Sequence, residues 1–208
     1  MYAIFGGNFN PIHYGHIYSA QNIAKEIKIK KIILLPNRNP PHKKITEISI
    51  IDKINMIKLA IKNNYLFTIS ILESKDKRIF YTIDTLKKIR KKIGYLKPLF
   101  FIIGQDNLEL FDTWKDWKKI LLLTHLIILP RKCTEKKNIF LKKWINSHMT
   151  NNIKLLHYQT AGLIFFSKIP LINISSSQIR DNYFQGKNSS QLLPYAVQQY
   201  INLKKLYL

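Results

Sequence analysis

The stretch YAIFGGNFNPIHYGH, residues 2–16, decides how this chain folds. It opens with a short apolar run, residues 2–5, that ends at two glycines, and this pattern predicts a buried strand followed by a tight turn. Apolar residues at helical spacing follow over residues 16–29, which predicts a helix that begins at the turn. A strand, a glycine turn and a helix in this order indicate an anion-binding site, because backbone N–H groups and the positive end of the helix point to the same place.

The alternation of apolar runs and helical patterns continues along the chain. Further strands are expected at 32–35, 67–71, 99–103 and 126–129, and helices at 50–63 and 81–93. This pattern predicts an α/β fold with a doubly wound, mostly parallel sheet of five to six strands and helices on both faces. Three polar segments follow strands directly, at Gly6, Pro36 and Gly104, and parallel sheets bind ligands beyond the carboxyl ends of their strands.

The pattern is weaker after residue 130. A helix is expected at 133–148, strands at 153–157 and 163–166, and helices at 176–185 and 192–203 that form a small C-terminal helical part. We expect a single domain, 1–208, in which residues 1–130 form the core sheet and residues 131–208 complete it.

Composition narrows the possible partners. The formal net charge is +22, from 34 Lys and Arg against 12 Asp and Glu, but the lysines are scattered in pairs, so we expect no dedicated nucleic-acid face. The single cysteine, Cys133, favours a reducing, cytoplasmic location. The longest apolar stretch, residues 120–129, is too short to span a bilayer, so we expect no membrane partner. The oligomeric state is left open.

His13 and His16 stand three residues apart where the turn meets the helix. Each imidazole could donate a hydrogen bond to a phosphate oxygen at this position. Two other interpretations stay open: the histidines cap the helix incidentally, or they bind a metal, although no third ligand clusters with them. The residues alone therefore indicate an anion-binding turn and nothing more specific.

The pattern G-x-F-[DN]-P-x-H-x-G-H in residues 6–16 resembles the signature of the nucleotidylyltransferase superfamily, whose members transfer AMP or CMP to a phosphate. Residues 174–180, ISSSQIR, resemble the second motif of that superfamily, I-S-S-T-x-I-R. The resemblance implies a Rossmann-like nucleotidyltransferase fold, with His16, His13 and Arg180 as catalytic residues. The ATP-binding residues that it implies are Gly6, Gly7, Asn8, Phe9, His13, Gly15, His16, Gly104, Asp106, Ile174, Ser175, Ser176 and Arg180.

Over nearly its whole length, the chain is similar to the bacterial nicotinate-nucleotide adenylyltransferase family. Matching segments include NPPHK at 39–43, YT at 81–82, IIGQD at 102–106 and FDTW at 111–114. The resemblance implies transfer of AMP from ATP to nicotinate mononucleotide, giving deamido-NAD and pyrophosphate in NAD biosynthesis. The mononucleotide-binding residues that it implies are Asn37, His42, Lys43, Tyr81, Thr82 and Trp114. We expect Mg²⁺ as the cofactor, carried with ATP, and no metal ligand in the chain.

The resemblance gives some of these residues a role. Trp114 would stack on the nicotinate ring, the backbone at Tyr81 and Thr82 would donate to the nicotinate carboxylate, and Asp106 would accept from a ribose. Without the resemblance, Trp114 could equally be a core residue and Asp106 an ordinary helix cap. Asn8 stands where the family usually has Ser or Thr, and an amide can donate in place of the hydroxyl.

Three alternatives remain open from the sequence. The first is the same chemistry on nicotinamide mononucleotide or another phosphate acceptor. The second is a basic RNA-binding α/β protein, and the third is a metal-dependent hydrolase that uses His13 and His16.

Overall fold

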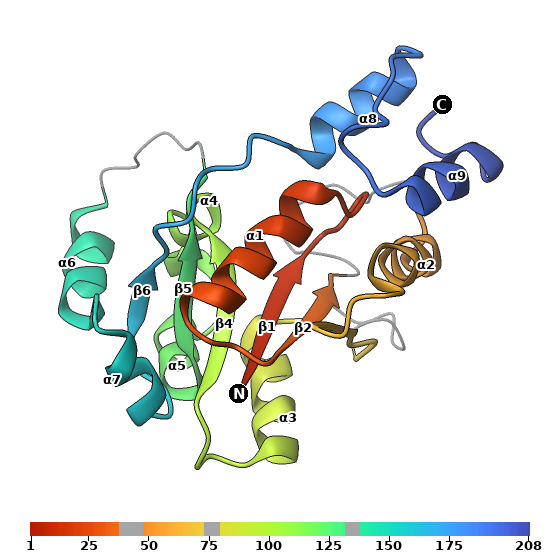
Figure 1. Ribbon diagram of the computed structural model, residues 1–208. Coiled ribbons are helices and arrows are strands. Elements are labelled where there is room, and N and C mark those ends of the chain that lie inside the picture. The colour runs from red at the N-terminus through yellow and green to blue at the C-terminus, as the bar shows by residue number, and fades with distance from the viewer. Residues whose placement is uncertain (38–47, 73–79, 132–137) are drawn as a thin grey trace.

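The computed structural model describes residues 1–37, 48–72, 80–131 and 138–208, drawn in colour in Figure 1. The strands are β1 (Tyr2–Gly7), β2 (Lys31–Pro36), β3 (Phe67–Ile69), β4 (Leu99–Gly104), β5 (His125–Leu129) and β6 (Ile164–Phe166). The helices are α1 (Tyr14–Glu26), α2 (Ile50–Ile61), α3 (Thr82–Ile93), α4 (Gln105–Leu108), α5 (Trp117–Leu123), α6 (Ile139–His148), α7 (Ile153–Tyr158), α8 (Ser176–Phe184) and α9 (Tyr195–Leu203), with a short 3-10 helix, η1 (Phe111–Thr113).

The six strands form one parallel sheet in the order β3-β2-β1-β4-β5-β6. The predicted doubly wound parallel sheet is thereby confirmed. The chain moves outward from β1 through β2 to β3, then returns to place β4 on the other side of β1 (Figure 1). The connections that leave β1 and β4 at their carboxyl ends therefore diverge, and such a switch point opens a crevice for a ligand.

Helices cover both faces of the sheet, because successive side chains of a strand point to opposite faces. Ala3 and Phe5 of β1 belong to the apolar cluster under α1, α2, α7, α8 and α9. Ile4, between them, belongs to the second cluster, which α3, α5 and α6 cover. β4 and β5 are buried along their whole length as a result, in agreement with their near-continuous apolar sequences.

The weaker patterns after residue 130 are confirmed in part. β6, α8 and α9 lie where a strand and two helices were expected, and the described part of the expected helix 133–148 is α6. The prediction of a strand at 153–157 is wrong, because these residues form α7. Asn152 caps this helix by accepting a hydrogen bond from the Lys154 N–H at 3.0 Å, and Leu156 is its only fully buried residue.

A buried arginine ties several segments together at the amino ends of β4 and β5. Arg90, on α3, is 1% exposed. Its guanidinium donates to the backbone carbonyls of Leu123, Gly94, Lys97 and Thr160, at distances between 2.6 and 3.1 Å. One side chain thus satisfies four carbonyl groups from three separate parts of the chain.

Candidate active site

The turn after β1 closes around one buried aromatic ring. Phe9 is 1% exposed, and its ring centroid lies 5.6 Å from that of Phe5 and 5.0 Å from that of His16. A Cβ at Gly7 would lie 2.9 Å from the Phe9 ring, so glycine allows the strand end to approach this closely. The Phe9 side chain therefore belongs to the core, and contact with ATP at this position would have to come from the backbone.

His13 and His16 hold each other across the start of α1. His13 Nδ1 accepts from the His16 N–H at 3.3 Å, and His16 Nδ1 accepts from the His13 N–H at the same distance. The two rings stack with their centroids 3.7 Å apart. Since each Nδ1 accepts, each neutral ring carries its proton on Nε2. The histidines are therefore capping residues, and the cap leaves the Nε2–H of each ring as a donor for a phosphate.

Both histidines are neutral near pH 7. Burial, and secondly the positive charge of Arg131, lower the pKa of His13 to about 3. Burial lowers the pKa of His16 well below its usual value, and His13 and Arg131 add to the shift. An imidazole in this environment donates a hydrogen bond without carrying a charge of its own.

The second motif packs directly onto the turn. Ser176 Oγ donates to the carbonyl oxygen of Pro11 at 3.0 Å, and Arg180 Nη1 donates to the carbonyl oxygen of Asn10 at 2.8 Å. α8 carries both donors, and β1 and α1 flank both acceptors (Figure 1). The structure thus joins the two sequence motifs in one place, at the carboxyl end of β1.

Gly15 allows this close packing. A Cβ at Gly15 would lie 2.9 Å from the His13 ring and 3.2 Å from the Cβ of Ile174, which begins the second motif. Ser175 caps α8 by accepting from the Gln178 N–H at 3.1 Å, as the sequence indicates. A larger residue at position 15 would push the histidine pair and the second motif apart.

Asn10 is 2% exposed, and both of its oxygens accept hydrogen bonds. Its carbonyl oxygen accepts from Arg180, and its Oδ1 accepts from the hydroxyl of Tyr207 at 2.6 Å. Burial raises the pKa of Tyr207, which keeps the phenol protonated as a donor. The amide at position 10 therefore serves as the acceptor that an Asp would provide.

The ends of β4 and β5 lie at the same edge of the sheet. Gly104 is the N-cap residue of α4, and Asp106 is exposed in its first turn, so Asp106 is not the cap. A Cβ at Gly104 would collide with the Asp106 carboxylate and come within 3.1 Å of Arg131 Cγ. Glycine thus lets the carboxylate of Asp106 fold over the strand end, beside the Arg131 side chain that follows β5.

Lys115, the residue after Trp114, contacts the start of α3. Lys115 Nζ lies 4.5 Å from the centre of the Tyr81 ring and 3.2 Å from Asp84 Oδ2 on α3. Tyr81 is the N-cap residue of α3, but its side chain makes no capping hydrogen bond. The helix that begins at Thr82 therefore has no side-chain cap on its first backbone N–H groups.

The Trp114 ring is half-buried and packs against two core phenylalanines. Its centroid lies 5.2 Å from that of Phe111 and 6.4 Å from that of Phe101. One side of the ring therefore belongs to the core, and the remainder stays open to a ligand.

Asn37 lies beside the β1 turn, as expected for a residue that follows β2. Its N–H donates to the Gly7 carbonyl oxygen at 2.9 Å. Lys53, on α2, donates through Nζ to Asn8 Oδ1 at 2.6 Å, and its Nζ lies 3.4 Å from the Asn37 carbonyl oxygen. The predicted site residues His42 and Lys43 lie outside the described residues.

Two basic residues at this edge were missed by the sequence reasoning, although the sequence carries a signal for each. Lys53 is 1% exposed and lies three residues after Ile50 and four before Ile57, so it falls on the apolar face of its helix. Arg131 comes directly after Pro130, which ends the last apolar strand of the core. A charged residue on the apolar face of a helix, and a charged residue directly after a strand, are each candidates for a functional site.

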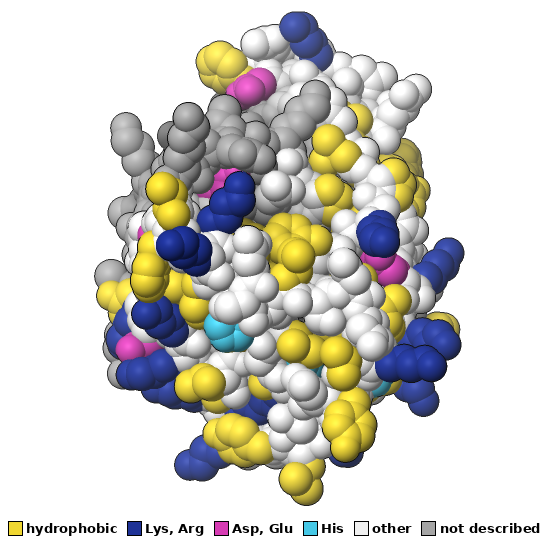
Figure 2. All heavy atoms as spheres, turned by 90° about the vertical axis from the view of Figure 1, so that its left-hand side faces the viewer, with side chains coloured by type: hydrophobic (Ala, Val, Ile, Leu, Met, Phe, Trp, Pro, Cys, Tyr) yellow, Lys and Arg dark blue, Asp and Glu magenta, His cyan; other side chains and the backbone are white. Residues whose placement is uncertain are grey.

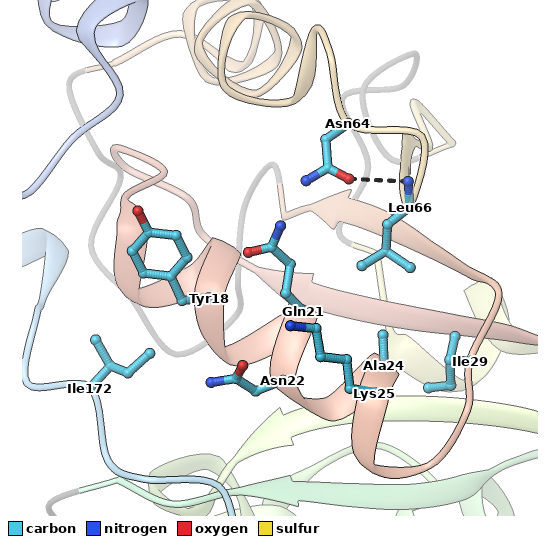
Figure 3. Close-up of a pocket in the computed structure, with 9 residues that line it drawn as sticks. All are labelled: Tyr18, Gln21, Asn22, Ala24, Lys25, Ile29, Asn64, Leu66 and Ile172. Carbon is cyan, nitrogen blue, oxygen red and sulfur yellow. Dashed lines mark hydrogen bonds between the residues drawn. The ribbon is translucent and has the colours of Figure 1, made fainter.

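Two hollows in the described part of the chain lie away from this edge. A groove of about 630 Å³ runs along the outer face of α1, where Tyr18, Gln21 and Lys25 point into it (Figure 3).

Among the described residues, no three His, Cys, Asp or Glu side chains cluster closely enough to hold a metal ion. No helix in that part of the chain is both long and apolar enough to cross a bilayer.

The fold is a six-stranded parallel sheet, and at its switch point the glycine turn after β1, called the phosphate-type turn below, contacts a helix that carries an arginine. This combination defines a nucleotide-binding protein of the nucleotidyltransferase class. The sequence matches the cytidylyltransferase-like family over residues 4–182. The chain belongs to this family and, within it, to the nicotinate-nucleotide adenylyltransferases.

Three relatives illustrate the membership, each named a probable nicotinate-nucleotide adenylyltransferase. The protein of Buchnera aphidicola subsp. Acyrthosiphon pisum (strain Tuc7) is 65% identical over 205 residues, covering 99% of this chain and 96% of the relative. That of Buchnera aphidicola subsp. Schizaphis graminum (strain Sg) is 61% identical over 207 residues, covering 100% and 96%. That of Serratia proteamaculans (strain 568) is 38% identical over 209 residues, covering 100% and 95%.

Solved structures share the fold. The Plasmodium falciparum nicotinic acid mononucleotide adenylyltransferase complexed with NaAD has a TM-score of 0.74 and 22% identity, covering 99% of this chain and 96% of its own. The same protein complexed with APC has a TM-score of 0.73 over the same shares of both chains.

Proposed function

We propose that this enzyme transfers AMP from ATP to nicotinate mononucleotide, giving deamido-NAD and pyrophosphate in NAD biosynthesis. The observation that carries the proposal is the junction of the two motifs, in which Arg180 and Ser176 bind the turn that holds His13 and His16. The names of the relatives and the ligands of the Plasmodium falciparum structures support the choice of ATP and nicotinate mononucleotide as substrates.

The reaction needs no general base. A phosphate oxygen of the mononucleotide, already anionic near neutral pH, attacks the α-phosphorus of ATP. A new P–O bond forms there while the bond from the α-phosphorus to its bridging oxygen breaks, and that electron pair leaves with pyrophosphate. The protein contributes positioning and stabilisation of the charge that develops on the phosphate oxygens.

We assign His16 and the amino end of α1 to the α-phosphate, and His13 to the phosphates beside it. Both rings are neutral and offer Nε2–H, so each donates one hydrogen bond without first taking up a proton. We assign Arg180 to the leaving pyrophosphate, which it would meet with the N–H groups that remain after its bonds to Asn10 and Ser177. Arg131, close enough to shift both histidines, adds positive charge at the same edge.

The rest of ATP meets the ends of β1 and β4 and the start of the second motif. Asp106 accepts from the ribose at the end of β4. The other proposed ATP contacts are Gly6, Gly7, Asn8, Phe9, Gly15, Gly104, Ile174, Ser175 and Ser176.

We place the nicotinate ring against Trp114 and its carboxylate at the uncapped start of α3. Backbone N–H groups at Tyr81 and Thr82 would donate to that carboxylate, and a flat half-buried indole suits a pyridine ring. Asn37, His42 and Lys43 complete the proposed mononucleotide site across the crevice. Nicotinamide mononucleotide remains the second candidate acceptor, since Lys115 beside Tyr81 favours a carboxylate only through its charge.

The substrate phosphates account for the proposed metal. Mg²⁺ keeps most of its ligands as water and phosphate oxygens, so it would reach the site on ATP, where it neutralises phosphate charge. We further propose that residues 1–208 act as one domain and work in the cytoplasm without a dedicated nucleic-acid or membrane partner. The scattered surface lysines support this proposal.

The test is pyrophosphate release from ATP with four acceptors in parallel: nicotinate mononucleotide, nicotinamide mononucleotide, phosphopantetheine and glycerol 3-phosphate. We expect rapid release with nicotinate mononucleotide and much less with the other three. Release that is faster with another acceptor would reassign the acceptor site. Absence of release with all four, together with salt-dependent retention on RNA, would favour the RNA-binding alternative.

A further inference from the structure

The Lys53 ammonium contacts both sides of the crevice. The inference drawn from it rests on the proposed function. Its Nζ lies 2.6 Å from Asn8 Oδ1, just after β1, and 3.4 Å from the carbonyl oxygen of Asn37, just after β2. Asn8 belongs to the proposed ATP half of the site and Asn37 to the proposed mononucleotide half. One buried side chain from α2 thus fixes a residue in each half.

The contact also decides which way the Asn8 amide faces. A lysine ammonium has donors and no acceptor, so the side of the amide that meets it must be Oδ1. The amide is planar, and its Nδ2 therefore lies on the side away from Lys53. Asn8 is half-buried while Lys53 is 1% exposed, so the accessible side of the amide is its nitrogen.

An amide nitrogen offers two N–H donors and no acceptor. Within the described residues, no acceptor is paired with Asn8 Nδ2, and the neighbouring Gly7 and His13 belong to the phosphate-type turn. An anion is the ligand that such a nitrogen suits. Without a fixed donor on its other side, the same amide could turn and present Oδ1, which would repel a phosphate.

We propose that Lys53 is a positioning residue that orients the Asn8 amide, so that Asn8 Nδ2 donates to a phosphate of ATP. The pair performs the task that the usual Ser or Thr hydroxyl performs at this position. A hydroxyl rotates to suit its partner, but an amide needs a neighbour that selects one of its two faces.

The first test separates this proposal from the proposed function. Wild-type pyrophosphate release is measured first, so that an inactive wild type counts against the function and an active one leaves the function standing. Asn8→Asp then keeps an oxygen for Lys53 and replaces Nδ2 by a second oxygen. We expect the Kd for a non-hydrolysable ATP analogue to rise about ten- to a hundredfold, through one lost bond to a charged group and added repulsion. A Kd within twofold of wild type would overturn the proposal.

The second test asks whether Lys53 acts through Asn8. Lys53→Met is made in the wild-type chain and in the Asn8→Ser background, and the Kd for the same analogue is measured in each. We expect a rise of at least about fivefold beside Asn8 and less than about twofold beside the self-orienting serine. Equal rises of the Kd in both backgrounds would show that Lys53 does not act through Asn8, which would overturn the proposal.

Three further variants keep the second test decisive. Lys58→Met, on the exposed face of the same helix, is the matched control and should leave the Kd unchanged. If Lys53→Met does not fold, Lys53→Arg and Lys53→Gln take its place: arginine, like lysine, has donors and no acceptor, whereas the glutamine amide can also accept and so does not select one face of Asn8. We expect the Kd of the arginine variant to stay closer to wild type, and the reverse order would contradict the proposal.

Discussion

The two histidines that cap α1 are also the two that we propose as phosphate donors. His13 and His16 use Nδ1 to hold the first turn of α1, and Nε2 remains for a substrate. A spacing of three residues predicts that both rings lie at the helix end, and this is what the structure has. It cannot predict which nitrogen of each ring the backbone occupies, because that depends on the path of the turn before the helix.

The buried, neutral state of His13 makes folding sensitive to acid. The unfolded chain takes up a proton at this residue near pH 6.5, whereas the folded chain does so only near pH 3. Between these values the unfolded state binds more protons, so the free energy of unfolding falls as the pH falls, by up to about 1.4 kcal/mol per pH unit. Above pH 6.5 the residue contributes no pH dependence.

The variant His13→Asn tests this expectation. An asparagine can still cap the helix but takes up no proton, so its stability should fall less steeply than that of wild type between pH 6.5 and pH 5. Urea unfolding at pH 7, 6 and 5 measures both slopes. Parallel slopes for the two proteins would contradict a neutral, buried His13.

At the scale of elements, the sequence predicts strands better than the helices between them. β1, β2, β4 and β5 are near-continuous apolar runs that end at glycine or proline, and both signals are local. α7 was mistaken for a strand because its five expected residues, IKLLH at 153–157, are too few to distinguish the period of a strand from that of a helix. The sheet order was beyond reach for another reason, since strand pairing depends on which residues meet across the sheet and not on any local pattern.

The prediction at this scale concerns the contribution of Arg90 to stability. Its guanidinium joins α3, the segment after α3 and the starts of β4 and β5. Arg90→Met should lower the free energy of unfolding by at least about 3 kcal/mol, since several carbonyl groups lose a charged donor at once. Urea unfolding at pH 7 measures the loss. Lys92→Met, exposed on the same helix, should change stability by less than about 0.5 kcal/mol. Similar losses in the two variants would contradict the role of Arg90.

At the scale of the whole molecule, positive charge is spread along the sequence in scattered lysine pairs. On the face drawn in Figure 2, Lys and Arg side chains lie mainly toward its left and right sides, with hydrophobic and uncharged side chains between them. The net charge of +22 therefore acts on anionic substrates as a general field, which salt screens. The sequence indicates this from the scattered lysine pairs, but only the structure shows which basic residues, Lys53 and Arg131, are turned toward the site.

The prediction at the scale of the whole molecule concerns Tyr207, because its hydrogen bond connects the last residues of the sequence to the turn after β1. Tyr207→Phe leaves Asn10 Oδ1 buried without its donor, so the free energy of unfolding should fall by about 1–3 kcal/mol. Chemical unfolding followed by fluorescence measures the change. Tyr195→Phe, at a residue that is 70% exposed, is the matched control and should cost less than about 0.5 kcal/mol. A Tyr207→Phe variant as stable as that control would show that the bond adds nothing.

The same hydrogen bond has a consequence for the order of events during translation. Asn10 and Tyr207 are 197 positions apart in the sequence. A ribosome that adds roughly 5–20 residues per second makes the tyrosine on the order of 10–40 s after the asparagine. The phosphate-type turn is thus among the first segments to leave the ribosome and among the last to acquire all of its partners. A nascent chain should gain affinity for ATP late in its synthesis, however early its first strand and helix form.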